Sequence, residues 1–270
     1  MIEAPIRPAA AEAAGVDRRH LLTATQMAQF VADGYLLFEG FVPDELNRAV
    51  YADQEAGRGR WNESEATRRV FEWEPVKGIL QSLVGRTPVY DHSALHVVGP
   101  QHHGAQFWHA DSIIDARPLA FDIQAMYFAH DAPKEMGPTL ILPGSHLRRA
   151  SNDSISRYKN IVGQKQLAGP AGTIAFLHQA LWHCAQPNYT DHTRYMFKLR
   201  LRPGEEQRGL FNTDGYDTPE VRKIVGGAYH AWHGGEARAE NVERAKLWRY
   251  VCGDDRADVS FEGVLTRMHL

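Results

Sequence analysis

Residues 193–202 read TRYMFKLRLR and alternate between two kinds of side chain. In a strand, successive side chains point to opposite faces. One face would carry Arg194, Met196 and Lys198. The other face would carry the aromatic and aliphatic residues Tyr195, Phe197, Leu199 and Leu201. This period of two predicts a strand whose apolar face packs against helices and whose polar face serves another purpose.

Similar short runs, rich in Val, Ile, Phe and Tyr, occupy most of the region from Thr87 to Pro203. Gly, Pro, Asn and Asp separate them, as is usual between strands. The further strands that we predict span residues 88–98, 106–112, 121–130, 138–142, 172–178 and 181–186. Several short strands at this spacing favour a sandwich or a jelly roll.

Helical patterns lie on both sides of this strand-rich region. Those before it begin near Thr23, Pro43 and Pro75, and those after it begin near Pro219 and Glu240. Because helices and strands are segregated along the chain, the sequence predicts an α+β fold that is mainly β. The predicted core is a double-stranded β-helix, or jelly roll, with flanking helices.

The 270 residues contain no repeat and no clear linker, so we expect one domain over residues 1–270. Residues 1–20 are predicted to be a flexible lead-in. Residues 205–270 form a C-terminal extension and a candidate lid. Within this extension, we expect part of 205–240 to lie over or beside the candidate metal cavity described below. Trp232 and His233 are candidate lid residues.

Composition excludes several classes of protein. A net charge of -3 gives no basic surface of the kind that nucleic acids require. No apolar run approaches the ~20 residues that cross a bilayer, so we expect no membrane partner. Two cysteines exclude a disulfide scaffold. Together with an N-terminus that lacks the apolar segment of a secretory signal, they favour the cytoplasm. Oligomeric state cannot be read from the sequence.

The first candidate site is Phe107-Trp108-His109-Ala110-Asp111. On a strand, residues two apart face the same way, so His109 and Asp111 would project together into one cavity. A neutral imidazole and a carboxylate suit a divalent metal such as Fe(II).

The second candidate site joins His183 to Arg194. The polar stretch between them predicts a hairpin centred between Asn188 and Tyr189, which would place His183 directly opposite Arg194. His183 would then complete a two-histidine, one-carboxylate metal site. Such a set leaves open positions for a 2-oxo acid and for dioxygen, and Arg194 can hold the far carboxylate of the acid in bidentate fashion.

The order of four motifs resembles the phytanoyl-CoA dioxygenase-like family of Fe(II)/2-oxoglutarate-dependent oxygenases. The matching residues lie within 22–202. They are Thr25-Gln26 with Asp33-Gly34-Tyr35, then Trp108 to Asp111, then Met136 to His146, and finally Leu181-Trp182-His183 with Pro187-Asn188 and Arg194.

The resemblance implies a catalytic iron site of His109, Asp111 and His183, with Arg194 as the 2-oxoglutarate clamp. Further candidate contacts to the cosubstrate are Thr139, His96 and Met126. The resemblance also implies an oxygenase that oxidises, most often hydroxylates, a small organic metabolite with dioxygen and releases succinate and CO2. Two alternatives remain open: a metal-dependent hydrolase or isomerase that uses the same triad, and a non-catalytic binding module.

Overall fold

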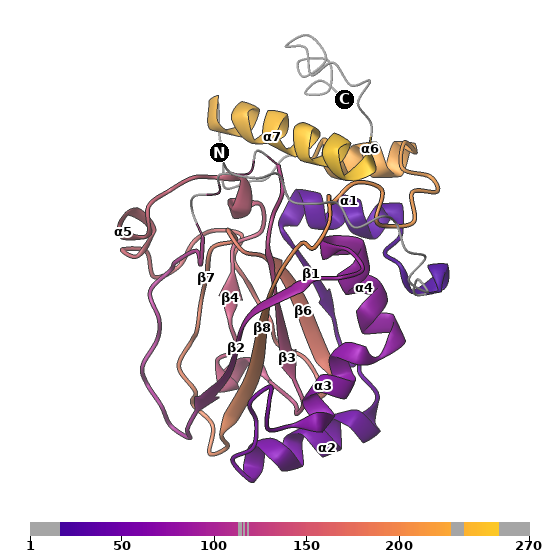
Figure 1. Ribbon diagram of the computed structural model, residues 1–270. Helices are drawn as coiled ribbons and strands as arrows, with labels where there is room; N and C mark the ends of the chain where they lie inside the picture. The colour runs from indigo at the N-terminus through magenta and orange to yellow at the C-terminus, as the bar shows by residue number, and fades with distance from the viewer. Residues whose placement is uncertain (1–16, 113–114, 116, 118, 228–234, 254–270) are drawn as a thin grey trace, which may run out of the picture.

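The computed structural model describes residues 17–112, 115, 117, 119–227 and 235–253. Within them, strands form two antiparallel sheets (Figure 1). The larger has the order β1-β6-β3-β8-β2 and is built from β1 (Tyr35–Phe38), β6 (Thr173–His178), β3 (Ile123–Phe128), β8 (Arg194–Arg202) and β2 (Val89–Val98). The smaller has the order β5-β4-β7 and is built from β5 (Lys165–Gln166), β4 (Leu140–Ile141) and β7 (His183–Cys184). These sheets form the predicted jelly-roll core.

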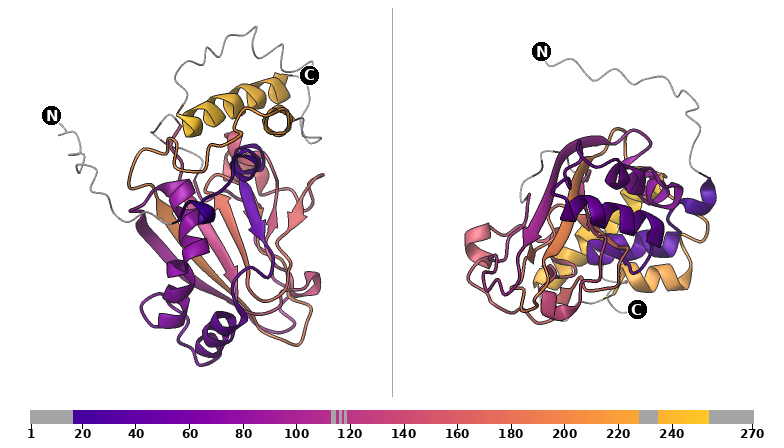
Figure 2. Two further views of the ribbon diagram at one scale, coloured as in Figure 1. Left: turned by 90° about the vertical axis from the view of Figure 1, so that its right-hand side faces the viewer. Right: turned by 90° about the horizontal axis from the view of Figure 1, so that it is seen from below.

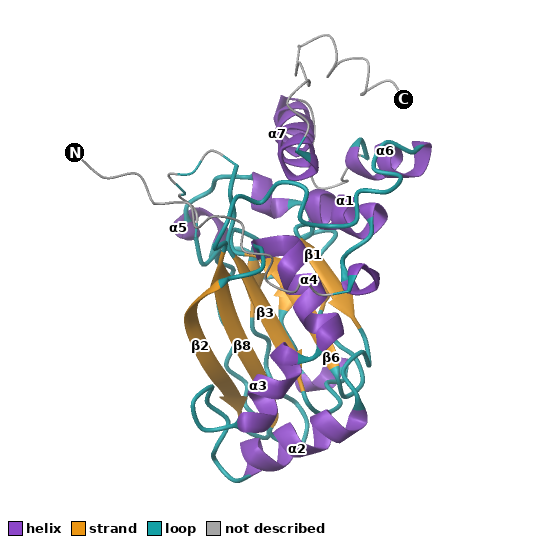
Figure 3. Cartoon of the chain, turned by 45° about the vertical axis from the view of Figure 1, so that its right-hand side comes forward, coloured by secondary structure: helices purple, strands orange, loops and turns teal. Residues whose placement is uncertain are grey.

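Helices cover the outer face of the larger sheet (Figures 2 and 3). The helices of the described residues are α1 (Ala24–Asp33), α2 (Asp44–Glu55), α3 (Glu65–Glu72), α4 (Glu74–Val84), α5 (Asn152–Ile155), α6 (Pro219–Val225) and α7 (Gly235–Cys252). Short 3-10 turns occur at η1 (Arg18–His20), η2 (Lys134–Met136) and η3 (Ser145–Leu147). Residues 18–20, predicted to be part of a flexible lead-in, thus form a regular turn, and η1 lies against α4. In the described chain, no helix combines the length and the apolar character that crossing a bilayer requires.

Strand β8 explains how the layers hold together. Its outer-facing Phe197, Leu199 and Leu201 are buried in one apolar cluster with side chains of α1 to α4. Tyr195 contacts the ring of Tyr51 on α2. The prediction that this face packs against helices is therefore confirmed.

The inner face of the larger sheet closes a second core between the sheets. Met126 and Met196 from the larger sheet lie in one buried cluster with Ile141 of β4 and with Leu181, just before β7. Cross-strand register makes Met126 the neighbour of Lys198. On this inner face an apolar side chain, Met126, thus adjoins a charged one, Lys198.

The predicted strand over 106–112 is wrong. Only His109 pairs, through an isolated bridge to His183, with their backbone N–H groups and carbonyls exchanging bonds of 3.1 and 2.9 Å. The partner strand β7 has only two residues, so no longer ladder can form. Beside the bridge, the segment makes only single backbone hydrogen bonds, from Gln106 to the Ala185 carbonyl and from Ser112 to the Gln179 carbonyl.

The predicted hairpin that would set His183 opposite Arg194 is also wrong. His183 pairs with Ile141 in the smaller sheet, whereas Arg194 pairs with Val98 in the larger one. The connection crosses between sheets instead of turning back. Its buried Asn188 donates to the carbonyls of Gly99 and His192 at 3.0 and 2.7 Å, which fixes this crossing.

Helices α6 and α7 pack at one end of the molecule, over α1 (Figure 1). Gln207 donates to the carbonyls of Leu83 and Phe121 and accepts from the backbone of Phe121, which joins the C-terminal segment to α4 and to the start of β3. On α7, Arg244 and Glu240 form a buried ion pair. These contacts tie the described residues of this region to the rest of the fold.

Candidate functional site

His109 and Asp111 come together with His183, which lies 74 residues after His109 along the chain. The bridge between His109 and His183 sets the two imidazoles side by side, with ring centroids 4.4 Å apart. The Oδ1 atom of Asp111 lies 3.8 Å from Nε2 of His109 and 3.9 Å from Nε2 of His183. Three ligand atoms therefore converge on one point.

Backbone contacts determine which nitrogen of each imidazole is free. Nδ1 of His109 lies 2.8 Å from the Phe107 carbonyl, and Nδ1 of His183 lies 2.9 Å from the Leu181 carbonyl. A carbonyl only accepts, so each Nδ1 carries the proton and each Nε2 presents a lone pair. This is the tautomer that a metal ligand needs. In each histidine, the contact between Nδ1 and the carbonyl also fixes the orientation of the ring.

The charge states also suit a divalent cation. Burial and the neighbouring His109 lower the pKa of His183 to about 4, which keeps this imidazole neutral near pH 7. Burial alone would raise the pKa of Asp111, but His183 and Lys198 together hold it below its ordinary value. Two neutral nitrogens and one carboxylate are the donor set that Fe(II) accepts in a facial arrangement. The residues present thus fit the metal that the sequence implied.

A cavity of about 290 Å³ opens beside the two imidazoles. Its lining includes all four residues predicted as cosubstrate contacts: His96, Met126, Thr139 and Arg194. The Nε2 atom of His96 is buried without a hydrogen-bond partner. An unpartnered polar atom in a cavity wall indicates that a polar ligand belongs there, so the cavity fits 2-oxoglutarate.

Arg194 is held in place by the backbone around it. Its Nη1 donates to the carbonyl of Met136 at 2.9 Å and also to that of Gly137. The side chain is 3% exposed, and burial lowers its pKa to about 10, so it remains a cation at neutral pH. A buried guanidinium at a cavity wall is positioned to bind a carboxylate.

Gly137 allows the backbone to take the conformation that holds Arg194, and a substitution at Gly137 tests this role. Its φ is +66°, and a Cβ there would overlap the carbonyl oxygen of Pro187. We expect Gly137→Ala to lower the free energy of unfolding by about 2 to 5 kcal/mol, from left-handed strain plus overlap. Gly163→Ala is the matched control, because Gly163 has φ +87° with open space around it, and should lose only about 1 kcal/mol. Equal losses in urea denaturation would show that the overlap is relieved.

The motif Pro143 to His146 supports the site from behind. The buried Ser145 Oγ accepts from the backbone N–H of Trp182 at 2.9 Å, next to the ligand His183. His146 packs under Gly34 at the end of α1, and its Nε2 lies 3.2 Å from the Val31 carbonyl. These residues join α1 to the smaller sheet.

Lys198 is the site residue that the sequence did not single out. Its Nζ donates to Oδ2 of Asp111 at 2.8 Å, and it lines the cavity. The alternation of 193–202 placed it on the face of Arg194, but only the bridge between His109 and His183 brings Asp111 within its reach.

No described residue of 205–227 or 235–253 lines the cavity. Trp232 and His233 lie outside the described residues.

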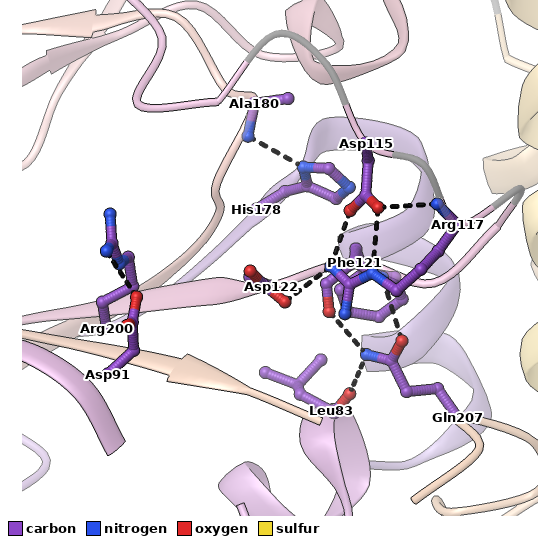
Figure 4. Close-up of polar contacts among 10 residues, drawn as sticks. All are labelled: Leu83, Asp91, Asp115, Arg117, Phe121, Asp122, His178, Ala180, Arg200 and Gln207. Carbon is purple, nitrogen blue, oxygen red and sulfur yellow. Dashed lines mark hydrogen bonds and ion pairs between the residues drawn. The ribbon is translucent and has the colours of Figure 1, made fainter. Parts of the chain in front are cut away.

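A polar network surrounds Arg117, between the metal-site segment and β3 in the sequence (Figure 4). Arg117 donates to Asp115 at 2.6 Å and to Asp122 at 2.7 Å. Beside it, Nδ1 of His178 accepts from the Ala180 N–H at 3.0 Å. The His178 ring contacts that of Phe121 at 5.3 Å. These contacts fix the start of β3 against the end of β6.

His178 and His183 make the metal-free protein acid-sensitive. Burial lowers the pKa of each to about 4, whereas an unfolded histidine titrates near 6.5. The unfolded chain therefore binds these protons first, so stability falls as the pH drops from about 6.5 to 4, by up to ~1.4 kcal/mol per pH unit for each histidine. In His178→Gln, the free energy of unfolding from urea denaturation should depend less steeply on pH between about 6.5 and 4, by the contribution of about one proton. An unchanged slope would contradict the assignment.

Fold and site together define a jelly-roll protein with a two-histidine, one-carboxylate site beside an arginine-lined cavity. The sequence profile of the phytanoyl-CoA dioxygenase (PhyH) family matches residues 15–196. The chain belongs to this family. No curated protein sequence matches it significantly.

Solved structures share the fold. The "non-heme alpha ketoglutarate dependent carbocyclase SnoK from nogalamycin biosynthesis" is 20% identical, with a TM-score of 0.57 over 71% of this chain and 88% of that one. EctD from S. alaskensis, solved with 2-oxoglutarate and 5-hydroxyectoine, is also 20% identical, with a TM-score of 0.55 over 67% of this chain and 76% of EctD. The epimerase SnoN, solved with Fe3+, alpha ketoglutarate and nogalamycin RO, is 17% identical, with a TM-score of 0.55 over 66% and 82%.

Proposed function

We propose that the protein is an Fe(II)- and 2-oxoglutarate-dependent oxygenase that hydroxylates a small organic metabolite. One observation carries the proposal: the free Nε2 atoms of His109 and His183 and the carboxylate of Asp111 converge at a cavity that Arg194 also lines. Membership of the PhyH family supports the same class of reaction.

Each residue has a role in this proposal. His109, Asp111 and His183 would hold Fe(II), which supplies the activation of dioxygen. Arg194 would bind the distal carboxylate of 2-oxoglutarate and fix its orientation, with His96, Thr139 and Met126 along the same cavity. The overall reaction consumes 2-oxoglutarate, dioxygen and a C–H bond, and it yields succinate, CO2 and an alcohol.

The protein side of the reaction is orientation and exclusion of water. The apolar cluster of Met126, Met196 and Leu181 lies beneath the site, and it limits entry of solvent from the core side. A hydrolase or isomerase would have no use for a buried guanidinium in this position, which favours the oxygenase. Neither Cys184 nor Cys252 forms a disulfide, as is usual in reducing compartments, and we propose a cytoplasmic location.

The test begins without oxygen. Fe(II) and 2-oxoglutarate together should give a weak visible absorption band at roughly 500 nm, as expected for a 2-oxo acid chelated to Fe(II) with these ligands. On admission of oxygen, succinate should form in equal amount to the 2-oxoglutarate consumed. A protein that binds metal but shows neither band nor succinate would contradict the proposal and favour a hydrolase, an isomerase or a binding module.

A further inference from the structure

A second group of polar side chains lies on the inner face of the larger sheet, further along β8 from Arg194. Residues that pair across antiparallel strands share one face. Gln124 on β3 is directly opposite Arg200 on β8, and Lys198 lies two residues before Arg200 on the same face. Arg194 lies at the other end of that face, on the far side of Lys198. The inner wall thus has two separate cationic regions, one at Arg194 and one at Lys198 and Arg200.

Lys198 shares Asp111 with the metal position, because Oδ2 of the carboxylate accepts from the ammonium and Oδ1 faces the two imidazoles. Its ammonium pairs with Asp111, and its side chain is 14% exposed. Fe(II) and Arg194 together carry three positive charges, which Asp111 and the two carboxylates of 2-oxoglutarate balance. Lys198 adds a further positive charge in a largely buried position, and the site then carries one excess positive charge, which is costly unless another anion binds there.

Gln124 gives an independent indication of a ligand. It is fully buried, and neither its amide nitrogen nor its amide oxygen has a hydrogen-bond partner. Across from it, the buried Nε of Arg200 also has no partner, although the guanidinium pairs with Asp91 (Figure 4). Buried polar groups without partners are rare and mark places where a ligand or water binds.

We propose that Lys198, with Arg200 and Gln124, binds a carboxylate of the substrate to be oxidised. The inference rests on the proposed function, because it assumes iron and 2-oxoglutarate at the neighbouring positions. Lys198 supplies the charge, Arg200 a second cationic donor, and Gln124 an amide donor. Because Asp91 already takes part of the charge of Arg200, one negative charge on the ligand suffices, which favours a carboxylate over a doubly charged phosphate.

Part of the proposed site is exposed. The side chains of Arg200 and Asp91 are 30% and 28% exposed, and that of His109 is 28% exposed. Lys198 and the metal-ligand candidates His109 and His183 line one cavity, so a substrate in that cavity can reach all three. Binding one end of the substrate here would fix which carbon lies next to the metal.

Acetate and its neutral counterpart acetamide are the probes for this inference. The protein is loaded with Mn(II) and saturating 2-oxoglutarate, and paramagnetic relaxation of the methyl protons of each probe reports binding near the metal. We expect acetate to bind at least about tenfold more tightly than acetamide. Lys198→Met should abolish this preference and Arg200→Gln should weaken it. Arg202→Gln, which removes an exposed charge from the end of the same strand, is the matched control and should keep it.

Calorimetry with 2-oxoglutarate and metal analysis on every variant separate the possible failures. Wild-type protein that shows no preference for acetate, or a preference that survives Lys198→Met, would overturn the inference. Loss of 2-oxoglutarate binding in Lys198→Met would also overturn it, because Lys198 would then belong to the cosubstrate site. Failure of the wild type to bind 2-oxoglutarate at all would instead refute the proposed function.

Discussion

Asp111→Ala is expected to lose most of the oxygenase activity and to bind iron at least about 10- to 100-fold more weakly. That range is typical for loss of residues that only orient metal ligands, so loss of a ligand itself should reach it. Two further effects add to the loss. The remaining imidazoles are neutral, so no negative charge offsets the cation, and Lys198 is left without its carboxylate partner next to the metal position. Succinate release and iron content after gel filtration measure the two losses.

A double variant separates these effects. If the unpaired Lys198 repels the metal, Asp111→Ala combined with Lys198→Met should bind iron more tightly than Asp111→Ala alone, though more weakly than wild type. Asp153→Asn, which alters an exposed carboxylate in the first turn of α5, is the control and should behave as wild type. Wild-type iron content and succinate release in Asp111→Ala would mean that the metal is held elsewhere.

Local patterns carried most of the fold prediction. The alternation of 193–202 predicted β8 to within one residue, and the runs at 88–98 and 172–178 predicted β2 and β6 equally closely. In each case the information lies in consecutive residues, because side-chain direction in a strand depends only on position along it. The jelly roll followed from the number and spacing of such runs.

Pairing between distant segments was harder to predict. The sequence placed His183 opposite Arg194 because a polar stretch between two apolar runs suggests a hairpin, and the structure assigns them to different sheets. Both nevertheless line one cavity, because the two sheets face each other. The contact of Lys198 with Asp111, 87 residues away, depends on this packing and has no local signature. The same holds for the unpartnered Gln124, which looks like any polar residue within a strand.

Arg194→Ala is expected to leave iron binding nearly intact and to weaken 2-oxoglutarate strongly. A charge-assisted bidentate pair in a desolvated site contributes on the order of 2–4 kcal/mol, or about 30- to 1000-fold in affinity. The structure adds a second consequence. Removal of the guanidinium takes its donor from the buried carbonyls of Met136 and Gly137, of which Gly137 keeps only the N–H of Gln186 at 3.3 Å, so the free energy of unfolding should also fall by about 1–3 kcal/mol.

Arg194→Lys distinguishes the two roles of the guanidinium. An ammonium keeps the charge but cannot present the planar pair of donors that binds a carboxylate in bidentate fashion. We therefore expect Arg194→Lys to regain part of the stability but little of the 2-oxoglutarate affinity, as measured by urea denaturation and by calorimetry on the Mn(II) protein. Arg202→Ala, at the exposed end of β8, controls for loss of a cation from the strand. If 2-oxoglutarate binds Arg194→Ala as tightly as wild type, the clamp lies elsewhere, and the free Nε2 of His96 is the next group to test.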